Sequence, residues 1–305
     1  MAELTWGTPL FFDLWAAGMA GGAYFAAFLL SFFGLDKDRR LLKAATYIGV
    51  PLVLLGVVLI IVDLGEPMRA FNMYLGMTPH GWEVLSGTGA ASMRLWPPFL
   101  AFFPVSPMSI GGWALMLFII CGLVLIVLFL AESAKAWELQ GAVGWGVDVL
   151  KALRPLITLF SWATFGLAIL LMIYTGVLLA ATSMKLWHTM LLTPLFVASA
   201  TGTGVAALII VVRIVRSAEG GMTPMLRSAL KVLLVLQLVV LVLFLIWALA
   251  AGAASTLVTG GVGLVFWLGV VVVGVILPLL LEYRTAKATS GAILFLSPLL
   301  VLQGG

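Results

Sequence analysis

Charged side chains are scarce in this sequence. Its 305 residues include only 16 Lys and Arg and 12 Asp and Glu, or 9% charged residues, whereas soluble chains carry about 25%. At the same time 63% of the residues are hydrophobic, and the mean hydropathy is +1.23. An ordinary water-soluble domain is therefore excluded. The long apolar runs predict helices that satisfy their own backbone polar groups within hydrocarbon.

Cysteine and histidine, two frequent metal ligands, are almost absent. The single Cys121 lies within an apolar run, which excludes an internal disulfide and a cysteine-ligated cluster. The two histidines, His80 and His188, fall in expected connections between helices. A transmembrane b-type cytochrome instead takes axial ligands, usually imidazoles, from its spans. The sequence therefore predicts neither haem nor another metal site in this chain.

Apolar runs close to the length that crosses a bilayer, about 20 residues, recur along the whole chain. We expect spans at Pro9–Gly34, Ala45–Leu64, Pro107–Ala131, Leu156–Ala181, Leu191–Val212, Ala229–Ala250, Gly261–Leu281 and Ala288–Leu302. The first run lacks a basic leader and is too long for a cleavable signal peptide, so we expect it to be retained. The predicted fold class is an all-α integral membrane protein. Residues 1–305 would form one polytopic domain of about eight helices, arranged as two four-helix bundles.

The basic residues are distributed unequally between the connections. Thirteen of the 16 lie in or beside the connections after spans one, three, five and seven: Lys37, Arg39, Arg40, Lys43, Lys135, Lys151, Arg154, Arg213, Arg216, Arg227, Lys231, Arg284 and Lys287. The opposite side holds only Arg69, Arg94 and Lys185. Because Lys and Arg accumulate in cytoplasmic loops, the first set is expected in the cytoplasm and the N-terminus outside the cell (inner) membrane. The same bias accounts for the formal charge of +4 without a nucleic-acid partner.

Two connections have a distinctive composition. Residues 65–106 form a long external connection rich in Gly, Pro, Trp and Met. Connections of this length are usually functional or disordered, and the aromatic residues favour a docking or covering role over disorder. An interfacial aromatic belt that includes Trp82 is the alternative. Residues 132–155 alternate Trp and aliphatic residues with charges, which predicts an amphipathic segment on the cytoplasmic surface.

Only two acidic residues fall inside the expected spans, Asp13 and Asp63. An ionised Asp at the bilayer centre costs about 2.5–3.5 kcal/mol on insertion scales, so such residues are usually functional. Asp13 lies roughly one turn into the first span, and Asp63 lies near the external end of the second. Because the two helices run in opposite directions, both acids are expected at a similar depth. The alternative is that both are hydrated at the interface.

The face of the first span that carries Asp13 also carries small residues and a phenol. Ala17, Gly21 and Tyr24 follow Asp13 at helical spacing and share its face. Such a face is suited to a flat ring bound between helices, and equally to a tight packing seam.

Polar residues also gather toward the external end of the fourth span. Tyr174 lies within the span, and Lys185 and His188 lie in the turn that follows it. With Asp63 and Arg69 they would form a polar cluster beneath the long external connection. An apolar slot with hydrogen-bond donors and titratable groups suits a quinone, whose redox chemistry exchanges protons.

Several short motifs, in this order and spacing, resemble the NrfD-like family of membrane subunits. Members of that family are the membrane subunits of polysulfide reductase, nitrite reductase and related molybdoenzyme complexes. The motifs are Trp6–Pro9, the small-residue run Gly18–Gly22, Asp-Leu-Gly-Glu-Pro-Met-Arg-Ala-Phe at Asp63–Phe71, Ser-Pro-Met-Ser at Ser106–Ser109, and Tyr-Thr-Gly-Val-Leu-Leu-Ala at Tyr174–Ala180. The resemblance covers most of the chain and includes the eight-helix plan.

The resemblance implies a haem-free membrane anchor that binds menaquinone or ubiquinone near its external face. Its implied partners are a four-cluster ferredoxin-like iron–sulfur subunit and a catalytic molybdopterin subunit, which would hold the iron–sulfur clusters and the molybdopterin. The family's polar position in helix one corresponds to Asp13, and its helix-four tyrosine corresponds to Tyr174. Its acidic motif in helix two corresponds to Asp63. Family members often carry Asn or His where this chain has Asp13.

The predicted site follows from these assignments. Asp13 and Asp63 would relay protons, and Asp13, Tyr24, Tyr174 and His188 would contact the quinone. The residues expected to steady the external connections or a docked partner are Arg69, His80, Trp82, Arg94 and Lys185.

Two other classes of protein are compatible with an apolar polytopic chain. A secondary transporter or ion channel is expected to have polar groups and broken helices at mid-membrane, where this sequence offers chiefly Pro194 and Pro278 and no charge. A purely structural membrane anchor would have no quinone site at all. Binding of a quinone analogue separates the last class from the favoured hypothesis.

Overall fold

The computed structural model describes residues 8–36, 39–63, 74, 93–94, 101–102, 107–132, 153, 155–181, 186, 188–214, 222–254, 257, 260–284, 296 and 298–302, excluding the side chains of 8–11, 63, 93–94, 101–102, 222–223 and 260–262. Its long helices are α1 (Thr8–Phe32), α2 (Arg40–Asp63), α5 (Pro107–Glu132), α8 (Pro155–Ala180), α9 (Leu192–Ile214) and α10 (Met222–Ala250). The next span consists of α12 (Gly260–Val265), the π-helix η1 (Phe266–Ile276) and α13 (Leu277–Arg284). Between α2 and α5, the two-residue strands β1 (Met93–Arg94) and β2 (Ala101–Phe102) pair antiparallel.

Seven helices within the described ranges are long and apolar enough to cross a membrane. They coincide with the first seven predicted spans, so the predicted all-α membrane fold is confirmed. Two of them begin five or more residues earlier than the apolar runs indicated: α2 begins at Arg40 rather than Ala45, and α10 begins at Met222 rather than Ala229.

The early start of α2 has a local cause in Asp36, which is 2% exposed. Its carboxylate accepts hydrogen bonds from the backbone N–H groups of Arg40 at 2.9 Å, Leu41 at 2.8 Å and Leu42 at 3.4 Å. The N–H groups of a first helical turn have no partner within the helix, and a side-chain acceptor at this place stabilises the turn. Asp36 therefore extends α2 beyond its apolar run.

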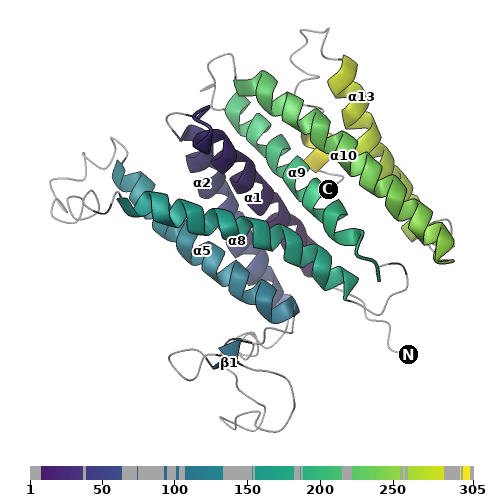
Figure 1. Cartoon of the computed structure of the whole chain (residues 1–305), viewed down its shortest axis with the longest axis horizontal. Coiled ribbons are helices and arrows are strands. Elements are labelled where there is room, and N and C mark those ends of the chain that lie inside the picture. The colour runs from purple at the N-terminus through teal and green to yellow at the C-terminus, as the bar shows by residue number, and fades with distance from the viewer. Residues whose placement is uncertain are drawn as a thin grey trace.

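The helices lie side by side with their long axes roughly aligned (Figure 1). Helices α1, α2, α5 and α8 contact one another in a closed ring. The division into two four-helix bundles stays a prediction. Helix α9 packs on α1 and α8, α10 packs on α9, and α13 and η1 pack on α10. We call the end of the bundle at which α1 begins and α2 ends the Asp13 end, and the opposite end the Asp36 end.

All the Lys and Arg side chains that the structure describes lie at the Asp36 end. They are Arg39, Arg40, Lys43, Arg213, Arg227, Lys231 and Arg284. One of them, Lys43 on α2, forms a salt bridge of 3.0 Å with Glu132 on α5. The two ends of the bundle therefore differ in charge, as the unequal distribution in the sequence predicts.

Helices α1 and α9 cross in very close contact. A Cβ added to Gly22 would collide with the backbone carbonyl of Ala200 and lie 2.8 Å from the Cα of Thr201. A Cβ added to Gly204 would in turn collide with the backbone of Gly22 and lie 2.8 Å from the Cα of Ala23. Small residues permit this kind of approach in membranes, where close van der Waals packing favours helix association.

The last predicted span, Ala288–Leu302, lies largely outside the described residues. Its end packs against α1, because the indole Nε1 of Trp15 donates a hydrogen bond of 3.1 Å to the carbonyl of Leu302. Val301 beside it is 2% exposed and belongs to the main core. Between Arg284, at the Asp36 end, and Leu302 the chain thus returns at least to the depth of Trp15. A complete eighth crossing stays a prediction.

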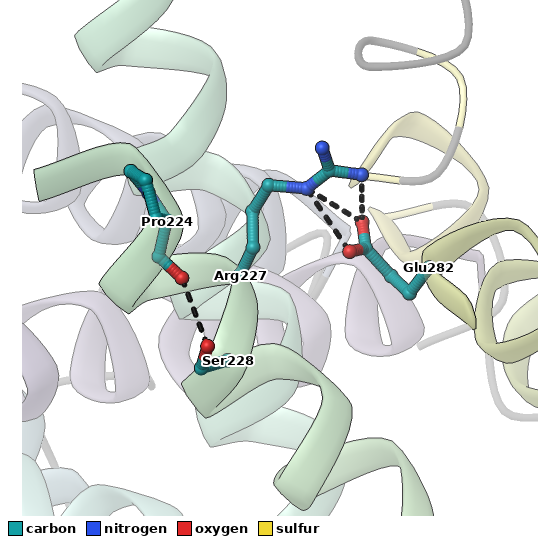
Figure 2. A network of polar contacts seen from close by, with 4 residues as sticks. All are labelled: Pro224, Arg227, Ser228 and Glu282. Atoms are coloured by element: carbon teal, nitrogen blue, oxygen red, sulfur yellow. Dashed lines mark hydrogen bonds and ion pairs between the residues drawn. The ribbon is translucent and has the colours of Figure 1, made fainter. Parts of the chain in front are cut away.

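A buried ion pair joins α10 to α13 at the Asp36 end (Figure 2). The Glu282 side chain is 0% exposed, and its two oxygens accept hydrogen bonds from Nε of Arg227 at 3.0 Å and from Nη2 at 3.1 Å. The prediction that Asp13 and Asp63 are the only acids within spans is wrong, because the third span ends on Glu132 and the seventh, which continues to Arg284, includes Glu282. The apolar run ends at Leu281, but pairing with a guanidinium offsets the cost of burying the next residue.

Replacing Arg227 by Gln should lower the free energy of unfolding by about 1.5–3 kcal/mol, the range for hydrogen bonds to charged groups. Gln is polar but cannot match the charge or the forked geometry of the guanidinium, so the Glu282 carboxylate loses its best partner. Thermal denaturation of the detergent-solubilised chain should show a lower midpoint. The same change at the exposed Arg284 is the control and should leave the midpoint within error. Equal midpoints for wild type and Arg227→Gln would contradict the importance of this pair.

Candidate functional site

The most unusual polar group among the described spans is Asp13, in the second turn of α1. Asp13 is 1% exposed, and its Oδ1 is buried without a hydrogen-bond partner among the described residues. A buried carboxylate oxygen without a partner is costly, so such a group in a native structure requires an explanation. One explanation is a ligand or a proton that this oxygen receives during function.

Helix α2 leaves room for Asp13 by presenting a glycine to it. A Cβ added to Gly56 would lie 2.6 Å from Oδ1 of Asp13 and 3.1 Å from its Cα. A larger residue at position 56 would therefore displace either the carboxylate or α1. The pair of helices closes around the acid from this side.

Tyr174 of α8 occupies a comparable place against α5. Its side chain is 7% exposed, and a Cβ added to Gly111 would collide with its ring and lie 2.8 Å from Cζ. Gly111 therefore makes the space that the phenol ring fills. Asp13 of α1 lies within electrostatic range of Tyr174 of α8 at the Asp13 end of the bundle.

A second tyrosine, Tyr74, reaches the same place from the connection between α2 and α5. Its hydroxyl donates a hydrogen bond of 3.0 Å to the backbone carbonyl of Gly112, and its ring lies edge-on to Trp113 with centroids 5.5 Å apart. Burial raises the pKa of Tyr74, and the carboxylate of Asp13 raises it further. Tyr74 also acts electrostatically on Tyr174. We call these three residues the Asp13–Tyr74–Tyr174 cluster.

Tyr74 was not among the residues selected from the sequence. It stands in a long connection, where neither hydropathy nor helical spacing distinguishes one tyrosine from another. The adjacent glycines of α5, Gly111 and Gly112, were the one available indication, since two successive glycines at the start of a span permit close approach by other groups.

The structure places Tyr24 outside the Asp13–Tyr74–Tyr174 cluster. It lies 11 positions after Asp13, about 16 Å further along α1 at 1.5 Å per residue. It is 0% exposed, its hydroxyl donates a hydrogen bond of 3.4 Å to the carbonyl of Ser161, and its ring lies edge-on to Phe118. Between the two, a Cβ added to Gly21 would lie 3.1 Å from the carbonyl of Ala168. At Gly21 this face of α1 is thus a packing seam.

His188 lies in the turn between α8 and α9 and is exposed, so it does not line the buried cluster in this structure. Six other predicted site residues cannot be placed by their side chains, because these lie outside the described residues: Asp63, Arg69, His80, Trp82, Arg94 and Lys185. For Asp63 the backbone is described and ends α2 at the Asp13 end. Gly56, whose added Cβ would touch Asp13, precedes Asp63 by seven residues, or about 10 Å along α2. The prediction that the two acids lie at a similar depth is therefore wrong. The assignments of these six residues stay predictions.

Comparison with known proteins agrees with the motifs that carry the resemblance. The family model described as "Polysulphide reductase, NrfD" matches residues 1–305. The C subunit of the polysulfide reductase of Wolinella succinogenes is 27% identical to this protein over 316 residues, which cover 99% of this protein and 90% of that subunit. Both matches span all the described helices, so they include the elements that carry Asp13, Tyr74 and Tyr174.

Proposed function

The chain belongs to the polysulphide reductase NrfD family, and we propose that it is the quinone-reactive membrane subunit of a respiratory oxidoreductase complex of the molybdoenzyme type. The lipid-soluble quinone, menaquinone or ubiquinone, binds at the Asp13 end of the bundle. This end faces the outside of the inner membrane, since all the described basic side chains lie at the opposite end.

One observation carries this proposal: Oδ1 of Asp13 is buried without a hydrogen-bond partner among the described residues, within electrostatic range of Tyr74 and Tyr174. The reduced form of a quinone supplies the donor that this oxygen lacks, because its ring is apolar enough to enter the bundle and its hydroxyl groups donate hydrogen bonds. The family membership and the named relative support the same chemistry. A structural anchor would have no need for an unpaired acid between closely packed helices.

Each residue of the cluster has a distinct role in this proposal. The Asp13 carboxyl exchanges protons with the bound ring, since a group that gains and loses a proton within hydrogen-bond reach is a general acid and base. The Tyr174 hydroxyl donates a hydrogen bond to a ring oxygen and fixes the orientation of the ring. Gly56 and Gly111 keep both side chains in place by admitting them between helices.

Electrons leave or enter through a partner. One cysteine is too few for an iron–sulfur cluster, which takes about four protein ligands, and this chain has only Cys121. We therefore expect a partner iron–sulfur subunit to dock at the Asp13 end, together with a catalytic molybdopterin subunit. The predicted docking residues are Arg69, His80, Trp82, Arg94 and Lys185, in the connections at that end.

Tyr174→Phe tests the proposed binding site directly. A short-chain quinone analogue should quench the tryptophan fluorescence of the full chain, purified in lipid nanodiscs. Loss of one neutral hydrogen bond should raise Kd about three- to tenfold in Tyr174→Phe. The matched change Tyr283→Phe, at a position that is 62% exposed, should leave Kd unchanged. If the wild-type chain and its complex bind no quinone analogue, the proposed function is wrong and a purely structural anchor is favoured.

A further inference from the structure

The hydrogen bond between Tyr74 and Gly112 has a fixed direction. A backbone carbonyl has lone pairs and no proton, so at 3.0 Å the Tyr74 hydroxyl must be the donor. A phenol carries one proton, and here that proton is committed to the backbone of α5. Any further hydrogen bond of Tyr74 must therefore be one that its oxygen accepts.

Asp13 is also available only as a hydrogen-bond acceptor. When ionised, a carboxylate only accepts hydrogen bonds, and Oδ1 of Asp13 has no donor among the described residues. Burial and the Asp13 charge both raise the pKa of Tyr74, which keeps the phenol protonated and its bond to Gly112 intact near neutral pH. Two acceptors, one from α1 and one from the connection between α2 and α5, thus lie within electrostatic range of one another.

The two redox forms of a quinone differ in the hydrogen bonds they can make. The oxidised ring presents two carbonyl oxygens, which only accept. The reduced ring presents two hydroxyl groups, each of which can donate. An acceptor facing a carbonyl leaves both groups without a partner, whereas an acceptor facing a hydroxyl gains a hydrogen bond, and leaving a buried polar group unpaired is the larger cost.

We infer that Tyr74 is a selectivity-determining residue that makes this site prefer the reduced, dihydroxy form of the ring over the oxidised form. This inference rests on the proposed function and adds to it the redox state that the site favours. The Tyr74 oxygen accepts a hydrogen bond from one ring hydroxyl, and Gly112 holds the phenol proton away from the ring. The ring of Tyr174 is fixed against Gly111. Its hydroxyl donates a hydrogen bond to a ring oxygen of either the oxidised or the reduced form.

The inference has a consequence for the bound couple. Tighter binding of the reduced form raises the midpoint potential of the bound quinone above that of the free quinone. For a two-electron couple, a tenfold difference in affinity corresponds to about 30 mV. Removing the Tyr74 hydroxyl should lower the bound potential toward the free value.

Tyr74→Phe tests this inference, because it keeps the ring on Trp113 and removes only the hydroxyl. Binding of a short-chain benzoquinone and of the corresponding quinol, kept reduced under argon, is measured by tryptophan quenching on the full chain in nanodiscs. We expect the Kd of the quinol to rise about three- to tenfold, while the Kd of the quinone changes less than twofold. The exposed Tyr283→Phe should change neither.

The outcomes separate this inference from the proposed function. If Tyr74→Phe weakens both forms equally, or neither, while the wild type binds both, Tyr74 only anchors the connection and the inference is overturned. If the wild type binds neither form, the proposed function itself fails. A thermal midpoint of Tyr74→Phe equal to that of the wild type, measured without ligand, shows that a selective loss of quinol binding is not a loss of fold.

Discussion

Replacing Asp13 by Asn should lower quinol-dependent turnover of the assembled complex by at least about 100-fold. A positioned acid or base typically contributes about 10²–10⁴-fold to a rate, and Asp13 is the one acid with a described side chain in the cluster. Asn has nearly the same shape, so the close contact with Gly56 is retained. Its amide, however, cannot take up or release a proton at the ring.

The measurement needs two electron donors or acceptors for the same preparation. In membranes that contain the complex, a quinol reports on the route through this chain, whereas a soluble redox dye exchanges electrons directly with the partner subunits. Asp13→Asn should lose the quinol-dependent rate and keep the dye-dependent rate. Glu132→Gln, which removes an acid in a partly exposed salt bridge at the opposite end, is the matched control and should keep both. Full quinol activity in Asp13→Asn would remove this residue from the proton route.

The apolar runs were sufficient to predict the positions of the spans, but their ends depend on other interactions. Hydropathy measures the cost of placing each residue in hydrocarbon, and it places seven spans correctly because few polar groups interrupt them. The ends at Asp36 and Glu282 depend on specific pairs, a carboxylate on backbone N–H groups and a carboxylate on Arg227. Such pairs join residues whose proximity only the folded chain determines.

The two central site residues could be selected from the sequence because polar groups are so rare within spans. Asp13 and Tyr174 each stand out from an apolar surrounding, and the structure brings them within electrostatic range of one another. The glycines that hold them, Gly56 and Gly111, could not be assigned, because their role appears only once α2 is known to pack on α1 and α5 on α8. Helical spacing also grouped Tyr24 with Asp13, yet residues on one face can lie far apart along the helix axis.

The residues of the cluster come from two kinds of element. Asp13 and Tyr174 come from helices packed within the closed ring of α1, α2, α5 and α8, whereas Tyr74 comes from the connection on which a partner is expected to dock. A partner that binds this connection would therefore contact the element that carries Tyr74, one of the two proposed acceptors for the quinol. Docking and ligand selection would be linked through a single hydrogen bond to the α5 backbone.

Gly22→Ala should prevent stable folding of the chain, although it adds a single methyl group. Overpacking of a core by side chains that can shift costs about 1–3 kcal/mol. Here the added Cβ meets the carbonyl of Ala200 and the Cα of Thr201, which are backbone atoms of α9 and cannot rotate away. Gly204 meets α1 in the same way from the opposite side, so separating the helices at one contact opens the other. We expect a loss well above 3 kcal/mol, seen as at least a tenfold lower yield of monodisperse protein.

Two other alanine substitutions serve as controls for this prediction. Gly18→Ala changes the same helix at a position where the new Cβ would lie 3.4 Å from the Cβ of Ala200, an ordinary contact distance. Gly166→Ala changes an exposed position on α8 where nothing lies within 4 Å, and it should be neutral or slightly stabilising because alanine favours helix over glycine. If all three variants gave the same yield and thermal midpoint, α1 and α9 could not cross as closely as the structure shows. Asp13 on α1 would then no longer be held at a fixed place relative to the rest of the bundle, because α9 packs directly against α1.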